Sequence, residues 1–442
     1  MNAVVAVDTL FPAHLRYVIS AIGDALRELE LDALAIAAGD SRLAFQDDQD
    51  YPFRANPWFR WPAPAPLAPG SIFHIENNGV PELFLVTPKD YWHAPPVLPK
   101  EPWTTQVRIT SVDSAQEARQ RIAASSGRTA WIGESPPPRT DWPVNPAPLL
   151  ARLEQARCRK TDYELARMRA ASLRGARGHL AAEKAFRQGL SELDIHLAFL
   201  AATRQNERDL PYDSIVALNE HAATLHYQLR DEQPPASRHS LLIDAGAAEA
   251  GYACDITRTW AAAAGDFAQL VAGMERLQQQ LCAGVRAGVD WREHHLLAQL
   301  HIATLLRDAG VLRMDPQAAV DAGVSAVFMP HGLGHLLGLQ VHDVGGFRPS
   351  AGAAPIARPE GHPSLRLTRR LEPGMVVTVE PGLYFIDSLL AQLREGPHAS
   401  AVDWTIVQRL RCCGGIRIED NVVVAENGGE NLTRAAFAAA GS

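Results

Sequence analysis

Three histidines and one aspartate share a short glycine-rich stretch, HGLGHLLGLQVHDVG, at residues 331–345. Four glycines stand among them, although glycine is unfavourable in a helix and weakens a strand. The pattern therefore indicates a backbone that turns sharply in order to hold imidazole groups. His331 and His335 have the spacing of a helical zinc motif, but the glycines between them argue against that helix. We expect the stretch to supply one metal ligand and to leave its other histidines for a substrate.

Two aspartates interrupt apolar, strand-like segments in SLLIDAGAAEAGYACDITRTW, at residues 240–260. Asp244 and Asp255 are eleven positions apart, so a hairpin centred between Glu249 and Ala250 would set them directly opposite each other. Their Cβ atoms would then be ~4.5–5.5 Å apart. Two carboxylates at that separation repel unless one is protonated or a cation compensates. Because aspartate is depleted in strands, we favour this interpretation over two solvated aspartates beside a turn.

Two glutamates occupy comparable positions further along the chain. Glu380 ends the β-branched run MVVTVE just before Pro381-Gly382, and Glu419 follows Arg417 by two positions in IRIEDNVVV. Taken alone, Glu380 is equally compatible with a surface residue, and Glu419 with a simple cross-strand salt bridge. The two glutamates indicate a metal site more clearly when they are considered together with Asp244, Asp255 and the histidines.

Two aspartates, two glutamates and one or more histidines form a carboxylate-rich, sulfur-free ligand set. Such a set suits manganese, with cobalt or zinc by substitution, better than a cysteine-type zinc site. Four carboxylates carry too much negative charge for one divalent ion with catalytic access. We therefore expect two ions ~3.5–4 Å apart that share a bridging hydroxide able to attack a carbonyl.

The bulk composition describes an ordinary soluble enzyme-sized chain. It has 442 residues, 47% hydrophobic and 21% charged, with a net charge of −8, which favours two domains and speaks against a nucleic-acid surface. The five cysteines are odd in number and two of them are adjacent, which predicts a reduced, cytoplasmic protein without a disulfide framework. We expect neither a signal peptide nor a membrane span.

The pattern of elements places a domain boundary near residue 157. A helix over 13–29 and several strands predict a small α/β domain, with the strands in LDALAIAAG, SIFHIE, ELFLVT and TAWIGE. A second unit begins with a capping box formed by Thr161 and Glu164, followed by a further helix from Ser191. We therefore predict domains at 1–157 and 158–442.

Read together, these segments make the sequence recognisable. IDAGA…CDITRTW, FMPHGLGHLLGLQVHDVGGF, TVEPGLYFI and GIRIEDNVVV resemble, in order and spacing, the prolidase (Xaa-Pro dipeptidase) family of pita-bread metallopeptidases. The likeness covers essentially the whole chain and is strongest to the bacterial proline dipeptidase branch that includes organophosphorus acid anhydrolase. It implies an α/β N-terminal domain followed by an α+β pita-bread catalytic domain.

The resemblance also implies roles for particular residues. The metal ligands would be Asp244, Asp255, His335, Glu380 and Glu419. Catalytic roles fall to Glu380, as proton shuttle, and to His342, as oxyanion stabiliser. The substrate pocket would be lined by His331, Arg366, Arg417, His226 and Tyr212. His221 competes with His226 for its place.

The implied reaction is hydrolysis of Xaa-Pro dipeptides by two divalent ions, most plausibly Mn²⁺, which releases proline. A side activity on organophosphorus esters is compatible with the same resemblance. The alternatives are an aminopeptidase P that acts on longer peptides and a non-catalytic binding protein on the same fold.

A homodimer is the expected assembly. Five aromatic residues in the loop at 47–61 would form an exposed apolar patch on a monomer: Tyr51, Phe53, Trp58, Phe59 and Trp61. In the family this loop helps to close the pocket of the partner chain. No nucleic-acid or membrane partner is expected.

Overall fold

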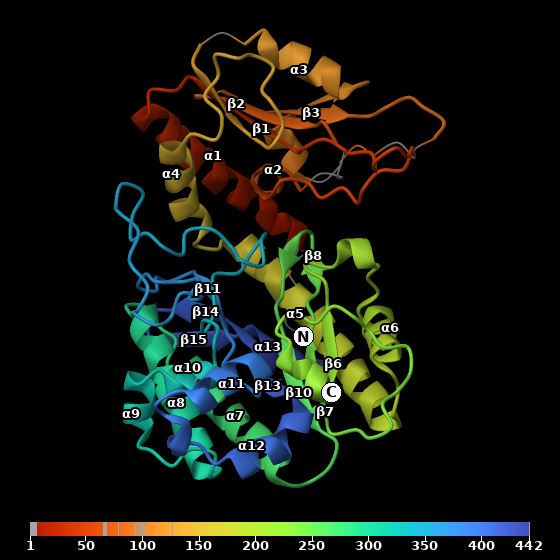
Figure 1. Ribbon diagram of the computed structural model, residues 1–442. Helices are drawn as coiled ribbons and strands as arrows, with labels where there is room; N and C mark the ends of the chain where they lie inside the picture. The colour runs from red at the N-terminus through yellow and green to blue at the C-terminus, as the bar shows by residue number, and fades with distance from the viewer. Residues whose placement is uncertain are drawn as a thin grey trace. The chain divides into compact units, whose positions relative to one another are not determined.

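The computed structural model is shown as a ribbon in Figure 1. It describes residues 7–441 except 65–68, 78, 93, 95, 97, 99–101 and 126. The chain forms two compact units: residues 1–157, 161–166 and 350–353 make up the first, and 158–160, 167–349 and 354–442 the second. Every predicted site residue lies in the second unit.

The first unit is built on a five-stranded mixed sheet with the order β4-β3-β2-β1-β5. Its strands are β1 (Ala33–Ala37), β2 (Ile72–Glu76), β3 (Glu82–Val86), β4 (Arg108–Val112) and β5 (Thr129–Ile132). Its helices are α1 (Phe11–Glu28), α2 (Pro57–Arg60), α3 (Ala115–Ala123) and α4 (Ala147–Arg157). The four predicted strands and the first helix are confirmed. The edge strand β4 was not predicted, because its sequence RITSV lacks an apolar run. In the structure, Val112 is its one buried residue.

The aromatic loop of the first unit differs from the prediction. Asn56 caps the short helix α2 by accepting a hydrogen bond from Trp58 N (2.9 Å), and this turn folds the following aromatic residues inward. Phe59 and Trp61 are 0% exposed, whereas Tyr51 is 58% exposed. The predicted patch of five exposed aromatic residues is therefore wrong for Phe59 and Trp61.

The second unit is an antiparallel α+β structure. One sheet has the order β10-β7-β6, with β6 (Ile215–Leu218), β7 (Ser240–Asp244) and β10 (Thr257–Ala261). The other has the order β11-β14-β15, with β11 (Val376–Val379), β14 (Asp420–Ala425) and β15 (Gly428–Asn431). A bridge between Thr257 and Glu419 joins the two sheets, and β12 (Gly382–Tyr384) pairs with β13 (Gly415–Arg417) beside them.

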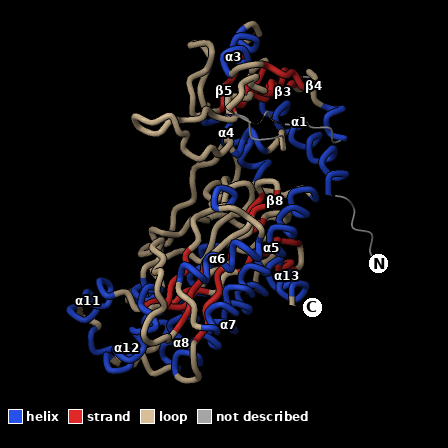
Figure 2. The backbone as a smooth tube through the Cα atoms, turned by 90° about the vertical axis from the view of Figure 1, so that its right-hand side faces the viewer, coloured by secondary structure: helices blue, strands red, loops and turns tan. Residues whose placement is uncertain are grey.

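Long helices lie outside these sheets (Figures 1 and 2). They include α5 (Asp162–Gln188), α6 (Glu192–Thr203), α7 (Asp266–Ala283), α8 (Trp291–Asp308) and α13 (Leu432–Ala440). The structure confirms the capping box of α5, since Thr161 N donates to Glu164 Oε2 (2.8 Å) and Glu164 N to Thr161 Oγ1 (3.5 Å). Helix α6 packs on β6, α7 on β10 and α13 on β14.

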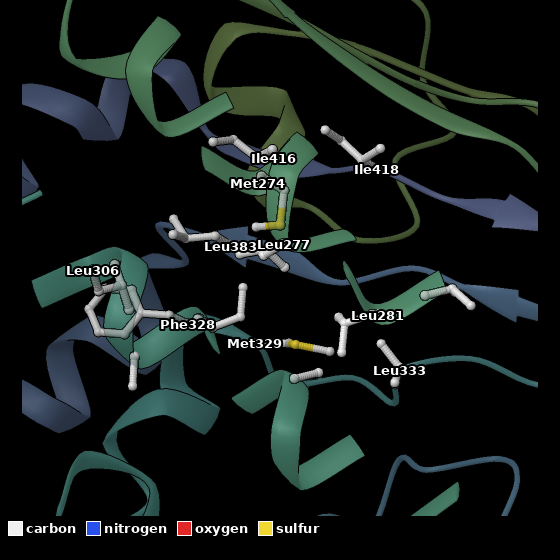
Figure 3. Packing of buried hydrophobic residues seen from close by; sticks show 14 of the residues in the cluster. Met274, Leu277, Leu281, Leu306, Phe328, Met329, Leu333, Leu383, Ile416 and Ile418 are labelled. Atoms are coloured by element: carbon white, nitrogen blue, oxygen red, sulfur yellow. The ribbon is translucent and has the colours of Figure 1, made fainter. Parts of the chain in front are cut away.

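The main hydrophobic core of this unit lies between the helices and the strands that carry the site (Figure 3). Met274, Leu277 and Leu281 come from one face of α7, and they pack toward Leu383 of β12 and Ile416 of β13. Burial of these apolar side chains fixes β12 and β13 against α7. Among the described residues, no helix is both long and apolar enough to cross a membrane.

The hairpin that carries the two aspartates turns one residue later than predicted. Strands β8 (Ala248–Glu249) and β9 (Tyr252–Ala253) flank a two-residue turn at Ala250 and Gly251, where φ is 49° and 90°. This positive-φ pair is the backbone that a type I′ turn requires. Thr257 therefore lies directly opposite Asp244. Asp255, two residues before Thr257, is the diagonal neighbour of Asp244. A shift of two positions keeps both carboxylates on one face of the hairpin.

A buried ion pair supports the segment that carries His342. Lys160 Nζ lies 2.9 Å from Asp343 Oδ2, and both side chains are fully buried. Asp343 Oδ1 also accepts a hydrogen bond from Val344 N (3.0 Å). A Cβ atom at Gly338 would overlap Asp343 Oδ2, so this glycine leaves room for the pair.

We predict that Lys160→Met lowers the free energy of unfolding by about 3–5 kcal/mol, because it removes the buried cation that compensates the charge of the Asp343 carboxylate. Urea unfolding measures this loss, and Lys160→Met with Asp343→Asn should recover part of it. Arg409→Met is the matched control, because the Arg409–Asp266 pair lies in the same unit with side chains 59% and 60% exposed. An unfolding midpoint for Lys160→Met equal to that of the wild type would contradict the prediction.

Candidate metal centre

The predicted metal ligands converge from separate elements of the second unit. Asp244 ends β7, Asp255 precedes β10, Glu380 follows β11, Glu419 lies between β13 and β14, and His335 belongs to the glycine-rich segment. Ligand atoms of Asp255, His335 and Glu419 all lie within 4.8 Å of one another. His335 Nε2 is 3.6 Å from Asp255 Oδ2 and 3.5 Å from Glu380 Oε1.

The glycine-rich segment reaches the centre by running antiparallel to β11. Thr378 N donates to His335 O (3.0 Å), and Glu380 N donates to Leu333 O (2.9 Å). A Cβ atom at Gly334 would overlap the carbonyl oxygen of Thr378, so only glycine allows the two backbones to lie this close. These main-chain hydrogen bonds place His335 beside Glu380.

The other glycines of this segment serve close packing more than sharp turning. Gly332 would press a Cβ atom to within 3.0 Å of Leu365 Cα, and Gly338 makes room for Asp343. Of the four glycines in residues 331–345, Gly345 is the one with a positive φ, at 88°. The predicted sharply turning backbone is therefore confirmed at Gly345 and replaced elsewhere by close approach of neighbouring atoms.

His335 presents an unprotonated nitrogen to the carboxylates. Its Nδ1 lies 3.0 Å from Leu336 O, and because a carbonyl only accepts hydrogen bonds, Nδ1 carries the proton. Burial lowers the pKa of His335 to about 3, so the ring is neutral. Its Nε2 lone pair then faces oxygens of Asp255 and Glu380 that carry lone pairs themselves. A cation between these atoms would convert mutual repulsion into attraction.

The carboxylates also fit a cation. Asp244 Oδ1 and Glu419 Oε1 are buried and have no hydrogen-bond partner among the described residues. Burial and then the neighbouring carboxylates raise the pKa values of Asp255 and Glu419 well above the usual range. Burial, opposed by the Arg417 charge, raises the pKa of Glu380 to about 7. The donor set fits a hard divalent metal ion.

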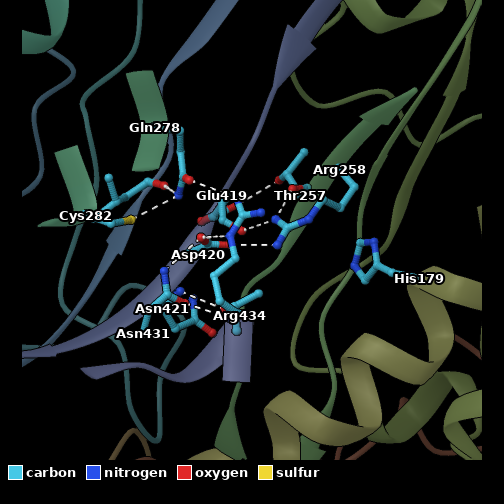
Figure 4. Close-up of polar contacts among 12 residues, drawn as sticks. His179, Thr257, Arg258, Gln278, Cys282, Glu419, Asp420, Asn421, Asn431 and Arg434 are labelled. Atoms are coloured by element: carbon cyan, nitrogen blue, oxygen red, sulfur yellow. Dashed lines mark hydrogen bonds and ion pairs between the residues drawn. The ribbon is translucent and has the colours of Figure 1, made fainter. Parts of the chain in front are cut away.

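A layer of polar residues behind the ligands holds their backbones (Figure 4). Asn421 Oδ1 accepts from Asp255 N (2.9 Å), and Asn421 Nδ2 donates to Asp255 O (2.5 Å). Arg258 Nη1 donates to Glu419 O (2.8 Å), and Thr257 Oγ1 donates to Glu419 Oε2 (2.7 Å). Both ligands are therefore fixed through side chains that do not belong to the ligand set.

Asp420 anchors this supporting layer. It accepts from Arg258 Nη2 (2.7 Å) and from Arg434 Nε (2.6 Å), and these two guanidinium groups, with hydrogen bonds, lower its pKa to about 2 despite full burial. The sequence analysis missed Asp420 and Asn421. The available signal was their place inside the apolar run of IRIEDNVVV, where aspartate and asparagine are depleted.

A further missed residue, Tyr384, links two predicted pocket residues. His331 Nδ1 lies 2.8 Å from Gly332 O, so His331 Nε2 accepts from the Tyr384 hydroxyl (2.9 Å). Arg417 Nη1 donates to the same hydroxyl (2.8 Å), and Arg417 Nη2 donates to Asp244 Oδ2 (2.7 Å). Arg417 is 4% exposed, so it is a buried partner of a ligand as well as a pocket residue.

Two other predicted pocket residues, Tyr212 and His342, contact the predicted ligands. The Tyr212 hydroxyl donates to Asp255 Oδ1 (2.5 Å), and the His342 ring meets the His335 ring edge-on at 4.5 Å. Burial and then the charges of Arg366 and His226 lower the pKa of His342 to about 4. Arg366 and His226 are themselves exposed to solvent.

Comparisons with known proteins agree with this arrangement. Residues 9–155 match the Xaa-Pro dipeptidase N-terminal domain, and residues 166–426 match metallopeptidase family M24. The chain is 46% identical over 433 residues to the Xaa-Pro dipeptidase of Stenotrophomonas maltophilia (strain K279a), which covers 98% of each chain. It is 45% identical over 437 residues to that of Xanthomonas euvesicatoria pv. vesicatoria (strain 85-10), covering 98% of this chain and 99% of that one.

Solved structures with the same fold include aminopeptidase P from E. coli with the inhibitor Pro-Leu, at a TM-score of 0.73 and 23% identity, covering 97% of this chain and 98% of that one. Pseudomonas aeruginosa aminopeptidase PepP gives a TM-score of 0.72 at 22% identity, covering 97% and 98%. At this level of sequence identity, the likeness to these structures shows the fold alone. The predicted fold, an α/β N-terminal domain followed by an α+β pita-bread domain, is confirmed.

One family model covers more than half of the chain, and close relatives align over nearly its full length. The chain therefore belongs to metallopeptidase family M24 and to its Xaa-Pro dipeptidases.

Proposed function

We propose that this protein hydrolyses Xaa-Pro dipeptides in a metal-dependent reaction that releases proline. The observation that carries the proposal is the convergence of three carboxylates, those of Asp255, Glu380 and Glu419, on the neutral imidazole of His335. The relatives that share 45–46% of its residues over nearly the whole chain are Xaa-Pro dipeptidases.

Two divalent ions, manganese by preference, would be held by Asp244, Asp255, His335, Glu380 and Glu419. When bound, such ions supply Lewis acidity at the scissile carbonyl and water that is activated at neutral pH. Four carboxylates match the charge of two divalent ions, and the unpartnered oxygens of Asp244 and Glu419 provide free lone pairs for them.

Glu380 is suited to move the proton during hydrolysis. Its carboxylate is half-buried and lies 3.5 Å from His335 Nε2, beside the other predicted ligands, where a side-chain carboxylate can take up and return a proton. The leaving nitrogen of an Xaa-Pro bond is a secondary amine, which must be protonated as it departs. Glu380 would carry the proton from the attacking water to this nitrogen, while His342, neutral at pH 7, donates a hydrogen bond to the developing oxyanion.

The two arginines would divide the remaining work. Arg366 is exposed, and its charge acts on Glu380 and His342, so it is well placed to bind the free carboxylate of a dipeptide. Arg417 already donates to Asp244 and to Tyr384, so its first role is to orient a ligand and, through Tyr384, His331. Arg417, His331, His226 and Tyr212 complete the pocket.

We further propose a domain boundary, a location and an assembly for the protein. The domains would meet at residues 157 and 158, and the five free cysteines suit a cytoplasmic, reducing environment. A homodimer would cover the exposed part of the loop at 47–61, including Tyr51.

We predict that the enzyme cleaves Xaa-Pro dipeptides and scarcely touches Xaa-Pro-Xaa tripeptides. A dipeptide presents its carboxylate one residue past the scissile bond, whereas a tripeptide would leave the carboxylate-binding arginine unpaired. Proline release from both substrates, with manganese added, measures the ratio. Equal kcat/KM values would contradict the dipeptidase proposal and favour an aminopeptidase P.

Substitution of the two arginines should separate their roles. We predict that Arg366→Ala lowers kcat/KM for dipeptides by about one to two decades, the effect of one lost charged hydrogen bond of roughly 1.5–3 kcal/mol, with unchanged metal content. Arg417→Ala should lower both activity and metal content, because Asp244 loses its partner.

Elemental analysis and steady-state kinetics give both readouts. The exposed Arg370, near Arg366 in sequence but directed to Gly288 and Asp290, provides the control Arg370→Ala. Full metal content in Arg417→Ala, or unchanged dipeptide kinetics in Arg366→Ala, would refute the assigned roles.

A further inference from the structure

One buried carboxylate outside the metal centre gathers an unusual number of hydrogen bonds. Glu192, the first residue of α6, is 1% exposed. Its Oε1 accepts from Leu218 N (2.8 Å) and His221 Nδ1 (2.8 Å), and its Oε2 accepts from the Tyr227 hydroxyl (2.8 Å) and Asp231 N (2.9 Å). All four donors belong to one segment, residues 218–231.

This segment connects β6 to β7 and contains little regular structure apart from the 3₁₀ turn Asn219–Ala223. Loops of this kind have few internal hydrogen bonds to hold them in place. Glu192 supplies contacts near both ends of the segment and, through Tyr227, close to its middle. The rings of His221 and Tyr227 stack at 4.5 Å, which joins two of the four donors to each other.

The arrangement distinguishes the two histidines that competed in the sequence. His221 is bonded to Glu192 and stacked on Tyr227, so it belongs to the framework. His226 immediately precedes Tyr227, whose hydroxyl donates to Glu192, and it is exposed to solvent. Of the two histidines, His226 is therefore the one whose imidazole can meet a substrate.

A metal site at this cluster is a poorer interpretation. Ligand atoms of Glu192, His221 and Asp231 lie within 4.8 Å of one another, as a metal site would require. However, an ionised carboxylate offers about four lone-pair sites, and those of Glu192 already accept four donors. A cation would have to displace these hydrogen bonds.

We infer that Glu192 is a positioning residue that holds His226 at the substrate pocket. It acts through the segment 218–231 and touches neither substrate nor metal ligands. The inference rests on the proposed function for the role of His226, whereas the anchoring of the segment stands on the hydrogen bonds alone.

The kinetic test compares Glu192→Gln, His226→Ala and the double variant on an Xaa-Pro dipeptide. Glutamine keeps the shape of the side chain but turns one acceptor oxygen into a donor that faces a main-chain N–H group, that of Leu218 or that of Asp231. We expect KM to rise about tenfold in each single variant, with kcat and metal content near wild type, because uniform binding is what is lost. The double variant should show little further loss, since both changes act on one contact.

A second readout does not depend on catalysis. Hydrogen exchange measured by mass spectrometry should show lower protection of residues 218–231 in Glu192→Gln. Tyr227→Phe, which removes one donor of four, should show a smaller loss and covers the case in which Glu192→Gln folds poorly. Glu207→Gln is the control, because Glu207 lies just after α6 with a side chain 71% exposed.

A KM equal to that of the wild type, or unchanged hydrogen exchange of residues 218–231, in Glu192→Gln would overturn the inference. So would losses of substrate-binding free energy that add fully in the double variant. Weakened protection in a protein that cleaves no Xaa-Pro dipeptide would instead overturn the proposed function and leave the anchoring role in place.

Discussion

Burial of several negative charges in one place is the constraint on which the rest of the second unit depends. Asp255 and Glu419 are buried, Asp244 and Glu380 lie beside them, and the imidazole among them is neutral. Arg417 is a buried cation that contacts this group, through Asp244. Its single charge does not balance the carboxylates, so their ionised forms require bound metal ions. Burial first, and then the neighbouring carboxylates, raise the pKa values of Asp255, Glu380 and Glu419.

Such a centre must be held from outside, because mutual repulsion would drive the ligands apart. The protein does this mainly through the backbone. Residues 333–337 run along β11 at a distance that only a glycine at position 334 permits. Asn421 forms hydrogen bonds with the main chain of Asp255, and Arg258 donates a hydrogen bond to the main-chain oxygen of Glu419. Asp420 in turn fixes Arg258 (Figure 4). Holding a ligand by its main chain leaves its carboxylate oxygens available for the metal.

Much of this could be predicted from residue types and spacing. Asp244 and Asp255 were visible because they interrupt apolar strands, and the glycines around His335 indicated an unusual backbone. The centre of the hairpin turn was misjudged by one residue, and the pairing therefore by two positions, since the positive φ of Ala250 is not readable from an alanine. Tyr384, Asn421 and Glu192 were missed for a different reason: their roles depend on partners 26 to 166 residues away, which periodicity does not reveal. The resemblance to a known family supplied the residue roles that spacing could not.

The most direct test of the account is an anomalous-diffraction map of crystals soaked in manganese. The account predicts two peaks per chain, within bonding distance of Asp244, Asp255, His335, Glu380 and Glu419 and close enough together to share carboxylate ligands. The fully metal-loaded protein should show none of the five side chains turned away. A single peak, no peak, or two peaks with any of these residues directed elsewhere would contradict it.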